Sequence, residues 1–501
     1  MQEGLKYYRF LAKGVNIVGS DKRELFAVNH GPNGVIDVTV RKLKKDGDAG
    51  KTLYHRSFEP GVTKELRLYG RGGKDIFSVT GTTRSPIKMR MIGGGGEDSF
   101  YVDRGLHNKE KLVIYDRSDK DNVYPAAGLA MLRTSEKEEV NDYNGRSFRY
   151  DILMPQATAG YNLDDGILLG VGLLYTRQGF RRDPFASRHR LMVGHALATN
   201  ATFVRYIGDF KKFVGNNDLR VSVNAKAPDN TSNFFGVGNE TEFLKIGDKP
   251  IRYYRTRYNL IQVHADLLRP LSSKVKLFAG ISGQFFSMGH EDNEGRYINV
   301  YQSEHLDKNL FSNKYFAGLN LGYEIDTRND ELMPTRGFYW RTTLMGMQQF
   351  GREKDTYGQL VTDMRFFMSF HADPRVVIAN HIGAGVLMGD PEFYQLLYAG
   401  GKESMAGFRA GRFAGKAMLY HNIELRVKLF DFTSYLFPGS VGLTGFNDIG
   451  RVWIRDEQSR KWHESYGGGL YITPAKLLLV SAFMAFSEEG TYPYINLGFR
   501  F

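Results

Sequence analysis

The stretch that decides the fold of this chain reads Leu419-Tyr420-His421-Asn422-Ile423-Glu424-Leu425-Arg426-Val427-Lys428-Leu429. From Ile423 to Leu429 every second residue is aliphatic, and the residues between them are charged. This period of two predicts a β-strand with one apolar and one hydrophilic face. Strands of ordinary sheets are about five or six residues long, whereas a strand that crosses a bilayer needs about nine to eleven. The stretch therefore favours a transmembrane strand over a strand of a soluble sandwich.

The same alternation recurs through the last two thirds of the chain, for example in Leu219–Lys226 and Val275–Ser282. We predict sixteen strands, which start near residues 147, 165, 187, 201, 218, 252, 274, 313, 336, 357, 375, 416, 439, 464, 476 and 492. In lipid only a closed barrel satisfies all the backbone groups of a sheet, and bacterial barrels have an even number of strands. The sequence therefore predicts an all-β chain in which 147–501 forms a sixteen-stranded antiparallel transmembrane β-barrel.

Composition limits what this chain can be. It has 501 residues, no cysteine, 57 glycines, 42% hydrophobic residues and a net charge of +12. The hydrophobic fraction excludes general disorder, and the lack of cysteine excludes disulfide scaffolds and thiolate sites. No run of about 18 apolar residues predicts a membrane helix. Because Met1–Lys6 lacks the apolar core of a secretory signal, the chain is either cytoplasmic or cut from a longer exported precursor, and the barrel pattern favours the second. The positive charge is interpreted as a basic lumen or surface, since no nucleic-acid motif accompanies it.

Residues 1–130 differ from the rest because their strands are short and glycine and aspartate turns separate them. They predict a small β-sandwich-like domain, and 131–146 predicts a charged linker. Gly70–Phe77 and Gly93–Phe100 repeat one another 23 residues apart. The second copy is similar to the calcium turn of secreted toxins, although that motif recurs about every nine residues. We expect turns capped by Asp75 and Asp98, with calcium binding as the alternative.

The connection after the eleventh predicted strand is rich in glycine. It reads Ala399-Gly400-Gly401-Lys402-Glu403-Ser404-Met405-Ala406-Gly407-Phe408-Arg409-Ala410-Gly411-Arg412-Phe413. Its glycines allow sharp turns and a close approach to a wall. Phe408, Arg409 and Arg412 are the side chains with which such a loop would dock.

This connection resembles the inward-folded loop of the BamA/TamA superfamily of outer-membrane assembly and transport barrels. The family loop has a Gly-Gly turn, here Gly400-Gly401, and an Arg-Gly-Phe core, of which Gly407 and Phe408 are present. It lies between strands eleven and twelve of a sixteen-stranded barrel, as it does in our count. Other stretches that fit the family in the same order are Asp326–Asp330 with Pro334–Gly337, Asn422–Arg426 and Gly445–Gly450. The resemblance covers about 147–501.

One position departs from the family. The residue before Gly407, an arginine in relatives, is Ala406 here. In relatives this arginine resembles a lock that pairs with carboxylates on the inner wall, and strand parity gives that place to Glu424 and Asp448. A buried carboxylate without a partner is costly or becomes protonated. We therefore expect Arg409 or Arg412 to take over the contact, with a looser loop as the alternative.

The last predicted strand alternates as far as Phe501, with Phe499 and Phe501 among its apolar positions and Asn496 and Gly498 facing inward. In bacterial outer-membrane barrels a final strand that ends in an aromatic residue is a signal for insertion, because an assembly machine can pair with its apolar edge. We expect Phe499 and Phe501 to form this signal.

The resemblance implies insertion or translocation of proteins at the outer membrane of a Gram-negative bacterium, with the N-terminal domain in the periplasm. A weak seam between the first and last strands would open and pair with a client strand, and the loop at 400–415 would brace it. The expected partners are outer-membrane lipid, unfolded outer-membrane or secreted client proteins and accessory lipoproteins, with no nucleic acid. We expect no enzyme activity, and we assign no catalytic residue, cofactor or metal ligand.

Two other interpretations stay open. A passive solute pore would favour anions through its wall cations, which are Arg220, Lys226, Lys276, Arg365, Arg426 and Lys428. A loop inside the lumen argues against high conductance. Alternatively, the barrel anchors or exports a hydrolase encoded upstream of Met1, as in some relatives of the superfamily. The reading frame upstream of Met1 discriminates this interpretation from the others.

Overall fold

In a computed structural model the chain folds into two compact units, Met1–Arg149 and Tyr150–Phe501. The structure describes residues 2–44, 46–138, 141–145, 149–245, 250–305, 309–351, 355–371, 374–435, 437–455, 457–475 and 478–501. The end of the predicted linker at 146 and the predicted strand starts at 147 and 476 lie outside these residues. No helix in the described part of the chain is both long and apolar enough to cross a membrane.

The first unit begins with a helix, α1 (Gln2–Leu11), which the strand pattern does not predict. The elements that follow are β1 (Gly14–Val18), β2 (Glu24–His30), the 3-10 helix η1 (Pro32–Gly34), β3 (Ile36–Leu43), β4 (Ala49–Phe58), β5 (Glu65–Arg71), β6 (Ile76–Thr80), β7 (Lys88–Gly94), β8 (Ser99–Val102), β9 (Leu112–Arg117) and β10 (Met131–Ser135). Strand β10 occupies the start of the predicted linker, because it pairs in parallel with β9.

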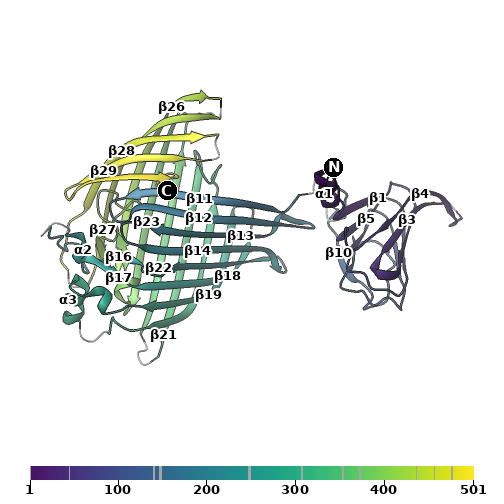
Figure 1. The fold of residues 1–501 in the computed structure, drawn as a ribbon, viewed down its shortest axis with the longest axis horizontal. Coiled ribbons are helices and arrows are strands. Elements are labelled where there is room, and N and C mark those ends of the chain that lie inside the picture. The colour runs from purple at the N-terminus through teal and green to yellow at the C-terminus, as the bar shows by residue number, and fades with distance from the viewer. Residues whose placement is uncertain are drawn as a thin grey trace. The chain divides into compact units, whose positions relative to one another are not determined.

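Two five-stranded sheets, β1-β5-β7-β9-β10 and β4-β3-β2-β6-β8, make up the first unit (Figure 1). From β5 to β9 the chain alternates between the two sheets. The parallel register pairs Glu65 with Lys88 and Ile76 with Ser99, so each 23-residue repeat is one coil that adds one strand to each sheet. Aromatic rings stack from coil to coil inside a shared core that includes Phe26, Phe77 and Phe100. A small β domain is therefore present, and much of it consists of parallel coils.

Asp75 and Asp98 stand at the same turn of successive coils. Oδ1 of Asp75 accepts a hydrogen bond from the Glu24 amide, and Oδ1 of Asp98 accepts one from the Asp75 amide, each at 2.8 Å. A Cβ atom at Gly70 or Gly93 would lie 2.4 Å from Oδ2 of Asp75 or Asp98, respectively, so only glycine fits beside them. The aspartates thus bond neighbouring coils to one another. Among the described residues, no three histidine, aspartate or glutamate side chains are arranged to hold a metal ion.

The second unit is a closed antiparallel barrel, and the prediction of sixteen strands is confirmed. Its strands are β11 (Ile152–Asn162), β12 (Gly166–Gly179), β13 (Arg182–Ala196), β14 (Ala201–Val214), β15 (Asn217–Lys226), β18 (Asn259–Pro270), β19 (Val275–Ser287), β20 (Lys314–Asp326), β21 (Gly337–Phe350), β22 (Thr356–Met368), β23 (Val376–Gly389), β26 (Ala417–Thr433), β27 (Pro438–Trp453), β28 (His463–Pro474), β29 (Val480–Ser487) and β30 (Gly490–Leu497). The strand predicted near 252 begins at 259, because a helical turn and a short strand come first.

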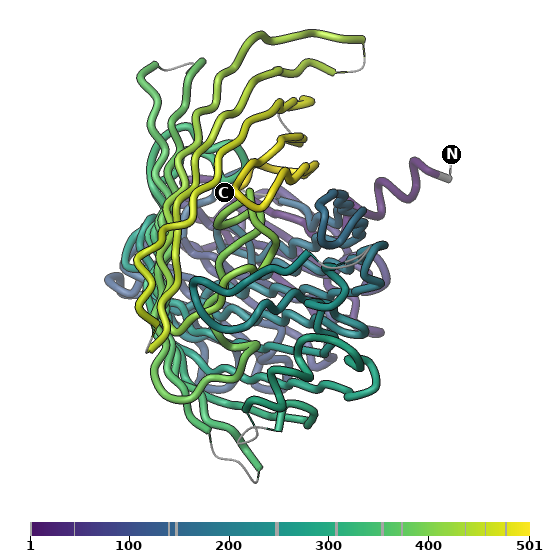
Figure 2. The backbone as a smooth tube through the Cα atoms, turned by 90° about the vertical axis from the view of Figure 1, so that its left-hand side faces the viewer, coloured from purple at the N-terminus to yellow at the C-terminus, as the bar shows by residue number. Residues whose placement is uncertain are grey.

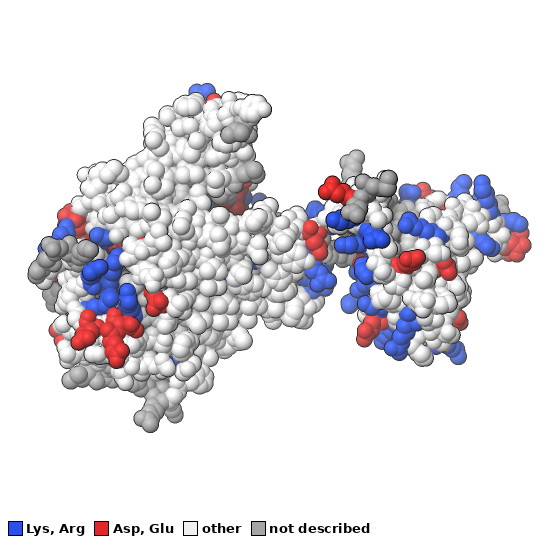
Figure 3. All heavy atoms as spheres, viewed as in Figure 1, with Lys and Arg blue, Asp and Glu red and all other residues white. Residues whose placement is uncertain are grey.

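The outer face of the barrel is apolar, as the alternation predicts. Val171 and Leu319 are each 69% exposed although they are aliphatic. In the view of Figure 3 the middle of the barrel wall is almost free of charged side chains, which lie toward its ends. Polar residues such as Asn320 and Arg426 point inward and are buried. An apolar exterior around a polar lumen is the arrangement that lipid requires.

The three long connections, 227–258, 288–313 and 390–416, leave the same end of the barrel, which faces the viewer in Figure 2. They contain β16 (Thr231–Asn233), α2 (Ile251–Tyr254), β17 (Arg255–Arg257), the 3-10 helix η3 (Glu291–Asn293), α3 (Tyr297–Glu304), the 3-10 helix η4 (Phe393–Gln395), β24 (Leu397–Ala399) and β25 (Phe413–Gly415). Shorter turns join the strands at the other end. In bacterial barrels the long-loop end is extracellular and the short-turn end periplasmic.

The last strand is shorter than its alternation predicts. Its ladder with β29 ends at the pair Val480–Leu497. Gly498 then takes a φ of +106°, a conformation that glycine adopts without strain and that turns the chain out of the sheet. Residues 499–501 therefore leave the strand, and the expectation that β30 runs to Phe501 is wrong.

Candidate functional site: a loop in the lumen beside the barrel seam

The glycine-rich connection starts and ends in the short hairpin of β24 and β25, which pair from Leu397–Gly415 to Ala399–Phe413. Gly400 and Gly401 turn the chain with φ values of +114° and +84°. A Cβ at Gly400 would lie 2.3 Å from the main-chain oxygen of Arg409, so a larger residue is excluded there. We call residues 400–412 the lumen loop.

Gly407 and Phe408 fix the tip of the lumen loop against the wall. A Cβ at Gly407 would lie 2.6 Å from Cβ of Ser465 and 2.7 Å from the main-chain oxygen of Phe486. Phe408 is fully buried, and its ring lies 5.4 Å from that of Phe413. The loop backbone therefore touches β28 and β29 directly, which only glycine permits.

Asp448 on β27 is the centre of a buried polar cluster that joins this loop to the wall. Its carboxylate accepts hydrogen bonds from the Ala406 amide at 2.9 Å, from Nδ2 of Asn422 at 2.8 Å and from Oγ of Ser465 at 3.1 Å. The ion pair of the cluster comes from Arg500, whose Nη2 lies 2.7 Å from Oδ2 of Asp448. The lumen loop thus reaches this carboxylate through its backbone.

The expected ion pair between a loop arginine and Glu424 or Asp448 is not the one that forms. Nε of Arg426 lies 2.7 Å from Oε1 of Glu424, and both side chains are buried. With Arg426 and Arg500 already beside the two wall carboxylates, the loop arginines bind elsewhere.

Arg409 and Arg412 tie the lumen loop to two hairpins at the long-loop end. Nη1 of Arg409 lies 3.0 Å from Oδ1 of Asp164, in the turn between β11 and β12. Nε of Arg412 lies 2.5 Å from Oε1 of Glu489, in the turn between β29 and β30. These two hairpins contain the first and last strands, so the arginines bridge both sides of the closure.

Arg500 is a residue of this candidate site to which the sequence did not point. Strand parity placed it with Asn496 and Gly498 on the inward face, so the signal for a lumen-facing cation was present. Its partner is 52 residues away in sequence, and nothing in the alternation indicates that distance. The predicted insertion-signal residues, Phe499 and Phe501, lie on either side of it and also face groups of the inner wall.

The seam between the first and last strands is short. Strands β11 and β30 pair at Gly160–Asn496 and Tyr161–Ile495. Strands β11 and β12, by contrast, pair at eleven positions. Tyr494, next to the seam, donates its hydroxyl to the main-chain oxygen of Ala406 at 3.0 Å. The lumen loop therefore packs directly behind the weakest part of the wall.

Comparison with known protein families identifies the superfamily to which this chain belongs. The Omp85 superfamily domain matches residues 193–501. This chain belongs to the Omp85 superfamily. The prediction of a BamA/TamA-type barrel of the Gram-negative outer membrane is thereby confirmed.

Solved structures give further similarities to this Omp85 barrel. BamA of Haemophilus ducreyi lacking POTRA domains 1–3 is 14% identical with a TM-score of 0.49, and the match covers 70% of this chain and 71% of that one. CdiB of Acinetobacter baumannii is 15% identical with a TM-score of 0.44, covering 70% and 60%. CdiB of Escherichia coli is 12% identical with a TM-score of 0.42, covering 69% and 63%. No curated protein matches the sequence.

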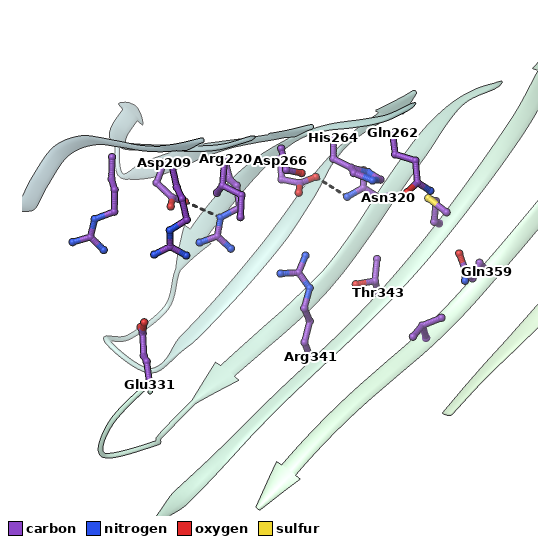
Figure 4. A pocket seen from close by; sticks show the side chains of 16 residues that line it. Asp209, Arg220, Gln262, His264, Asp266, Asn320, Glu331, Arg341, Thr343 and Gln359 are labelled. Carbon is purple, nitrogen blue, oxygen red and sulfur yellow. Dashed lines mark hydrogen bonds and ion pairs between the residues drawn. The ribbon is translucent and has the colours of Figure 1, made fainter. Parts of the chain in front are cut away.

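The lumen of this Omp85 barrel also contains a polar cavity of about 630 Å³ on the wall that includes β15 and β21. In Figure 4, Arg220 and Arg341 point into it from different strands, and dashed lines join Asp209 to Arg220 and Asp266 to Asn320. Other wall cations that the pore interpretation uses are paired as well: Lys276 with Glu324, Arg365 with Asp363 and Arg426 with Glu424. This pairing reduces the anion preference that their count alone would give.

Proposed function

We propose that this Omp85 barrel inserts or translocates other proteins, and that a client strand pairs at the edge exposed when β11 and β30 separate. The observation that carries the proposal is the seam of two residue pairs, beside a neighbouring ladder of eleven. Separating β11 from β30 breaks far fewer backbone hydrogen bonds than opening the wall at β11–β12. An open strand edge is a template for pairing with another chain.

The lumen loop supports this proposal because it holds both sides of the seam. Arg409 binds the hairpin that contains β11, and Arg412 binds the hairpin that contains β30. With the loop in place, the two edges stay in register although few backbone bonds join them. The loop therefore acts as a brace that keeps the opening local.

The topology supports a proposal for the sides of the membrane. Strand β11 begins at the short-turn end of the barrel, and in bacterial barrels that end is periplasmic. We therefore assign the preceding residues, including the β domain, to the periplasm. The partners that follow are outer-membrane lipid, unfolded outer-membrane or secreted clients and accessory lipoproteins.

The test is client insertion. The chain is reconstituted in liposomes, an unfolded outer-membrane barrel is added, and client folding is followed by its heat-modifiable gel mobility. We expect faster folding than in empty liposomes, and loss of the acceleration when Gly407→Ala and Phe408→Ala are introduced together. Variants whose own barrels keep heat-modifiable mobility are used, so that a lost activity is not a lost fold.

The absence of acceleration in folded, reconstituted protein would contradict the proposal and favour one of the alternatives. A steady ion conductance that deletion of 400–412 leaves unchanged would indicate a passive pore. A hydrolase motif in the reading frame upstream of Met1 would favour the anchor interpretation.

A further inference from the structure

The polar cavity of about 630 Å³ on the inner wall is lined by side chains of β13, β14, β15, β18, β20, β21 and β22. Glu331, in the turn between β20 and β21, also lines it, so the cavity reaches the short-turn end of the barrel. None of its described lining belongs to β11 or β30. The cavity is therefore separate from the seam.

Strand register gives this cavity two ends of different chemistry. In the ladders, Arg188 on β13 lies opposite Asp209 on β14, and Asp209 lies opposite Arg220 on β15. The same row continues from Arg220 to Asp266 on β18 and reaches Asn320 on β20. The end at β13–β15 is therefore rich in arginine. The polar side chains at the other end are mostly uncharged and include Gln262, His264, Asn320, Thr343 and Gln359.

Two guanidiniums at the β13–β15 end have no ion-pair partner. Arg188 and Arg190 both line the cavity, and neither forms an ion pair with a carboxylate of the described chain. Nε of Arg188 is buried without a hydrogen-bond partner among the described residues, and the guanidinium lies 4.2 Å from the ring centroid of Phe185. Arg220, by contrast, lies 2.7 Å from Oδ1 of Asp209. Because the planar fork of a guanidinium binds phosphate oxygens through parallel hydrogen bonds, Arg188 and Arg190 suit a phosphate group.

Arg341 also points into the cavity, from β21 (Figure 4). Its Nη1 lies 3.1 Å from Oε2 of Glu324, so this guanidinium already has a counter-charge. The unpaired cations of the lining therefore stay at one end. A ligand with one anionic group and one uncharged polar part matches this distribution of charge.

Several uncharged polar side chains of the cavity are without partners in the protein. They are Ser222, Gln262, Thr343 and Gln359, and none of them makes a side-chain hydrogen bond to another described residue. Asp266 adds a carboxylate, whose Oδ1 accepts from Nδ2 of Asn320 at 2.6 Å and whose Oδ2 remains as an acceptor. A hydroxyl group both donates and accepts hydrogen bonds, so amides, hydroxyls and a carboxylate together suit the hydroxyls of a sugar.

We propose that this cavity binds a phosphorylated sugar, with its phosphate on Arg188 and Arg190 and its hydroxyls on Gln262, Asp266 and Gln359. The volume lies within the range of about 300–1,000 Å³ that small-ligand sites have. The wall is closed around the cavity, so the ligand enters as a free solute from the short-turn end and not as the head group of a membrane lipid. This site goes beyond the proposed function and does not depend on it.

The test is isothermal titration calorimetry on the full chain in a non-ionic detergent and a phosphate-free buffer. The probes are glucose 6-phosphate, glucose and inorganic phosphate. We expect saturable binding of glucose 6-phosphate and no binding heat with glucose. Inorganic phosphate should bind about tenfold more weakly or worse, because it lacks the hydroxyls that would hydrogen-bond to the uncharged end.

A pair of charge variants locates the phosphate. Arg188→Gln with Arg190→Gln removes two cations that leave no carboxylate unpaired, and we expect the affinity for glucose 6-phosphate to fall about tenfold or more. The matched control, Arg205→Gln with Lys226→Gln, removes the same charge from lumen-facing positions outside the cavity lining and should leave the affinity unchanged. Heat-modifiable mobility confirms that both barrels are folded.

A third variant locates the sugar. Thr343→Ala with Gln359→Ala removes two side chains of the uncharged end, so the affinity for glucose 6-phosphate should fall while that for inorganic phosphate stays the same. A loss of both affinities by the same factor would overturn the assignment of this end to the sugar.

Three other outcomes would overturn the proposal. The first is the absence of saturable glucose 6-phosphate binding to the folded chain. The second is an equal loss of affinity in the two charge variants, because the general potential of the lumen would then attract the anion. The third is competition by phosphatidylinositol, with the barrel in phosphatidylcholine nanodiscs with or without this lipid, because the ligand would then be a lipid head group. The assays contain no client, so failure of client insertion would leave this site standing.

Discussion

Strand β11 holds its two neighbours in different ways. With β12 it forms a continuous ladder from Ile152–Thr176 to Asn162–Gly166, and with β30 it shares the pairs Gly160–Asn496 and Tyr161–Ile495. The two edges belong to the same strand and share its residue types and its lipid environment. The difference therefore comes from the partner, because β30 has eight residues and leaves the wall at Gly498.

What replaces the missing ladder is a set of side-chain contacts at the two ends of the seam. Arg409 and Arg412 act at the long-loop end, and the pair of Arg500 with Asp448 acts where β30 terminates. A β-ladder opens cooperatively and at a high cost, whereas separate ion pairs exchange one at a time. Under the proposed function, this exchange of a ladder for side-chain contacts is what lets the closed barrel open at one seam.

The largest expected effect follows from removing the difference between the two edges. The chain has no cysteine, so Gly160→Cys with Asn496→Cys introduces a single disulfide across the seam. We expect the rate of client folding to fall to the rate seen with empty liposomes. Addition of a reductant should restore the faster rate. The measurement is the client's heat-modifiable gel mobility over time.

The matched control for this lock is Thr158→Cys with Gly170→Cys, which are paired between β11 and β12 on the same face. This disulfide leaves the seam free, and client folding should keep its rate. Equal inhibition by both disulfides would mean that the rigidity of β11, and not the opening of the seam, matters for activity.

The next effect concerns the buried ion pair between Arg500 and Asp448 at the end of β30. Asp448→Ala leaves the buried Arg500 guanidinium without its counter-charge and removes the acceptor of the Ala406 amide. Breaking a buried ion pair from one side costs about 3–5 kcal/mol. We expect a loss of that size in the free energy of unfolding, measured in urea by the loss of the barrel's heat-modifiable mobility. Asp209→Ala, on the wall away from the seam, should cost less, because Arg220 stays 3.8 Å from Glu324.

A smaller effect is expected from overpacking the tip of the lumen loop. Gly407→Ala brings a Cβ to 2.6 Å from Cβ of Ser465 and 2.7 Å from the Phe486 main-chain oxygen. Overpacking of this kind costs about 1–3 kcal/mol, and the same urea measurement reports it. The control is Gly346→Ala, whose Cβ would meet nothing within 4 Å. Equal stability of the two variants would show that the loop yields without strain.

The sequence predicted the strands of this barrel well and the ion pairs beside its seam poorly, for a physical reason. Period-two alternation is a local property, so the strand through Ile423–Leu429 and the number of strands were correct without any partner being known. Ion pairs depend on which strands are neighbours and on how side chains share a crowded lumen. Parity alone placed Arg500 and Asp448 on the inner face, and it could not show that they meet. Gly498 gave no signal either, because glycine is also common within the strands of this chain.

The smallest expected effect on the seam is that of pH. A change of pH should leave the seam unaffected and should alter the stability of the first unit. The seam pairs contain no carboxylate, histidine or amine. In the first unit, burial raises the pKa of Asp98 to about 6 and that of Asp116 to about 7. Burial and the charge of Asp98 raise the pKa of Asp75 to about 9. Groups with raised folded-state pKa values give their full stability below the unfolded value near 4, and this stability is lost as pH rises through the folded values.

We therefore expect the first unit of the full chain to become easier to unfold from pH 5 to pH 9, as measured by pulse proteolysis in urea. The rate of client folding should not change from pH 5 to pH 9, because we expect the seam to limit it. This rate is first corrected for the client's own titration. Asp75→Asn keeps the Oδ1 acceptor for the Glu24 amide and removes the group with the highest pKa, so its stability should fall less with pH. If the unchanged first unit were instead most stable at pH 9, these carboxylates would have to be ionised in the fold. The coils would then be held by charge–dipole contacts to the turn amides rather than by protonated, buried acids.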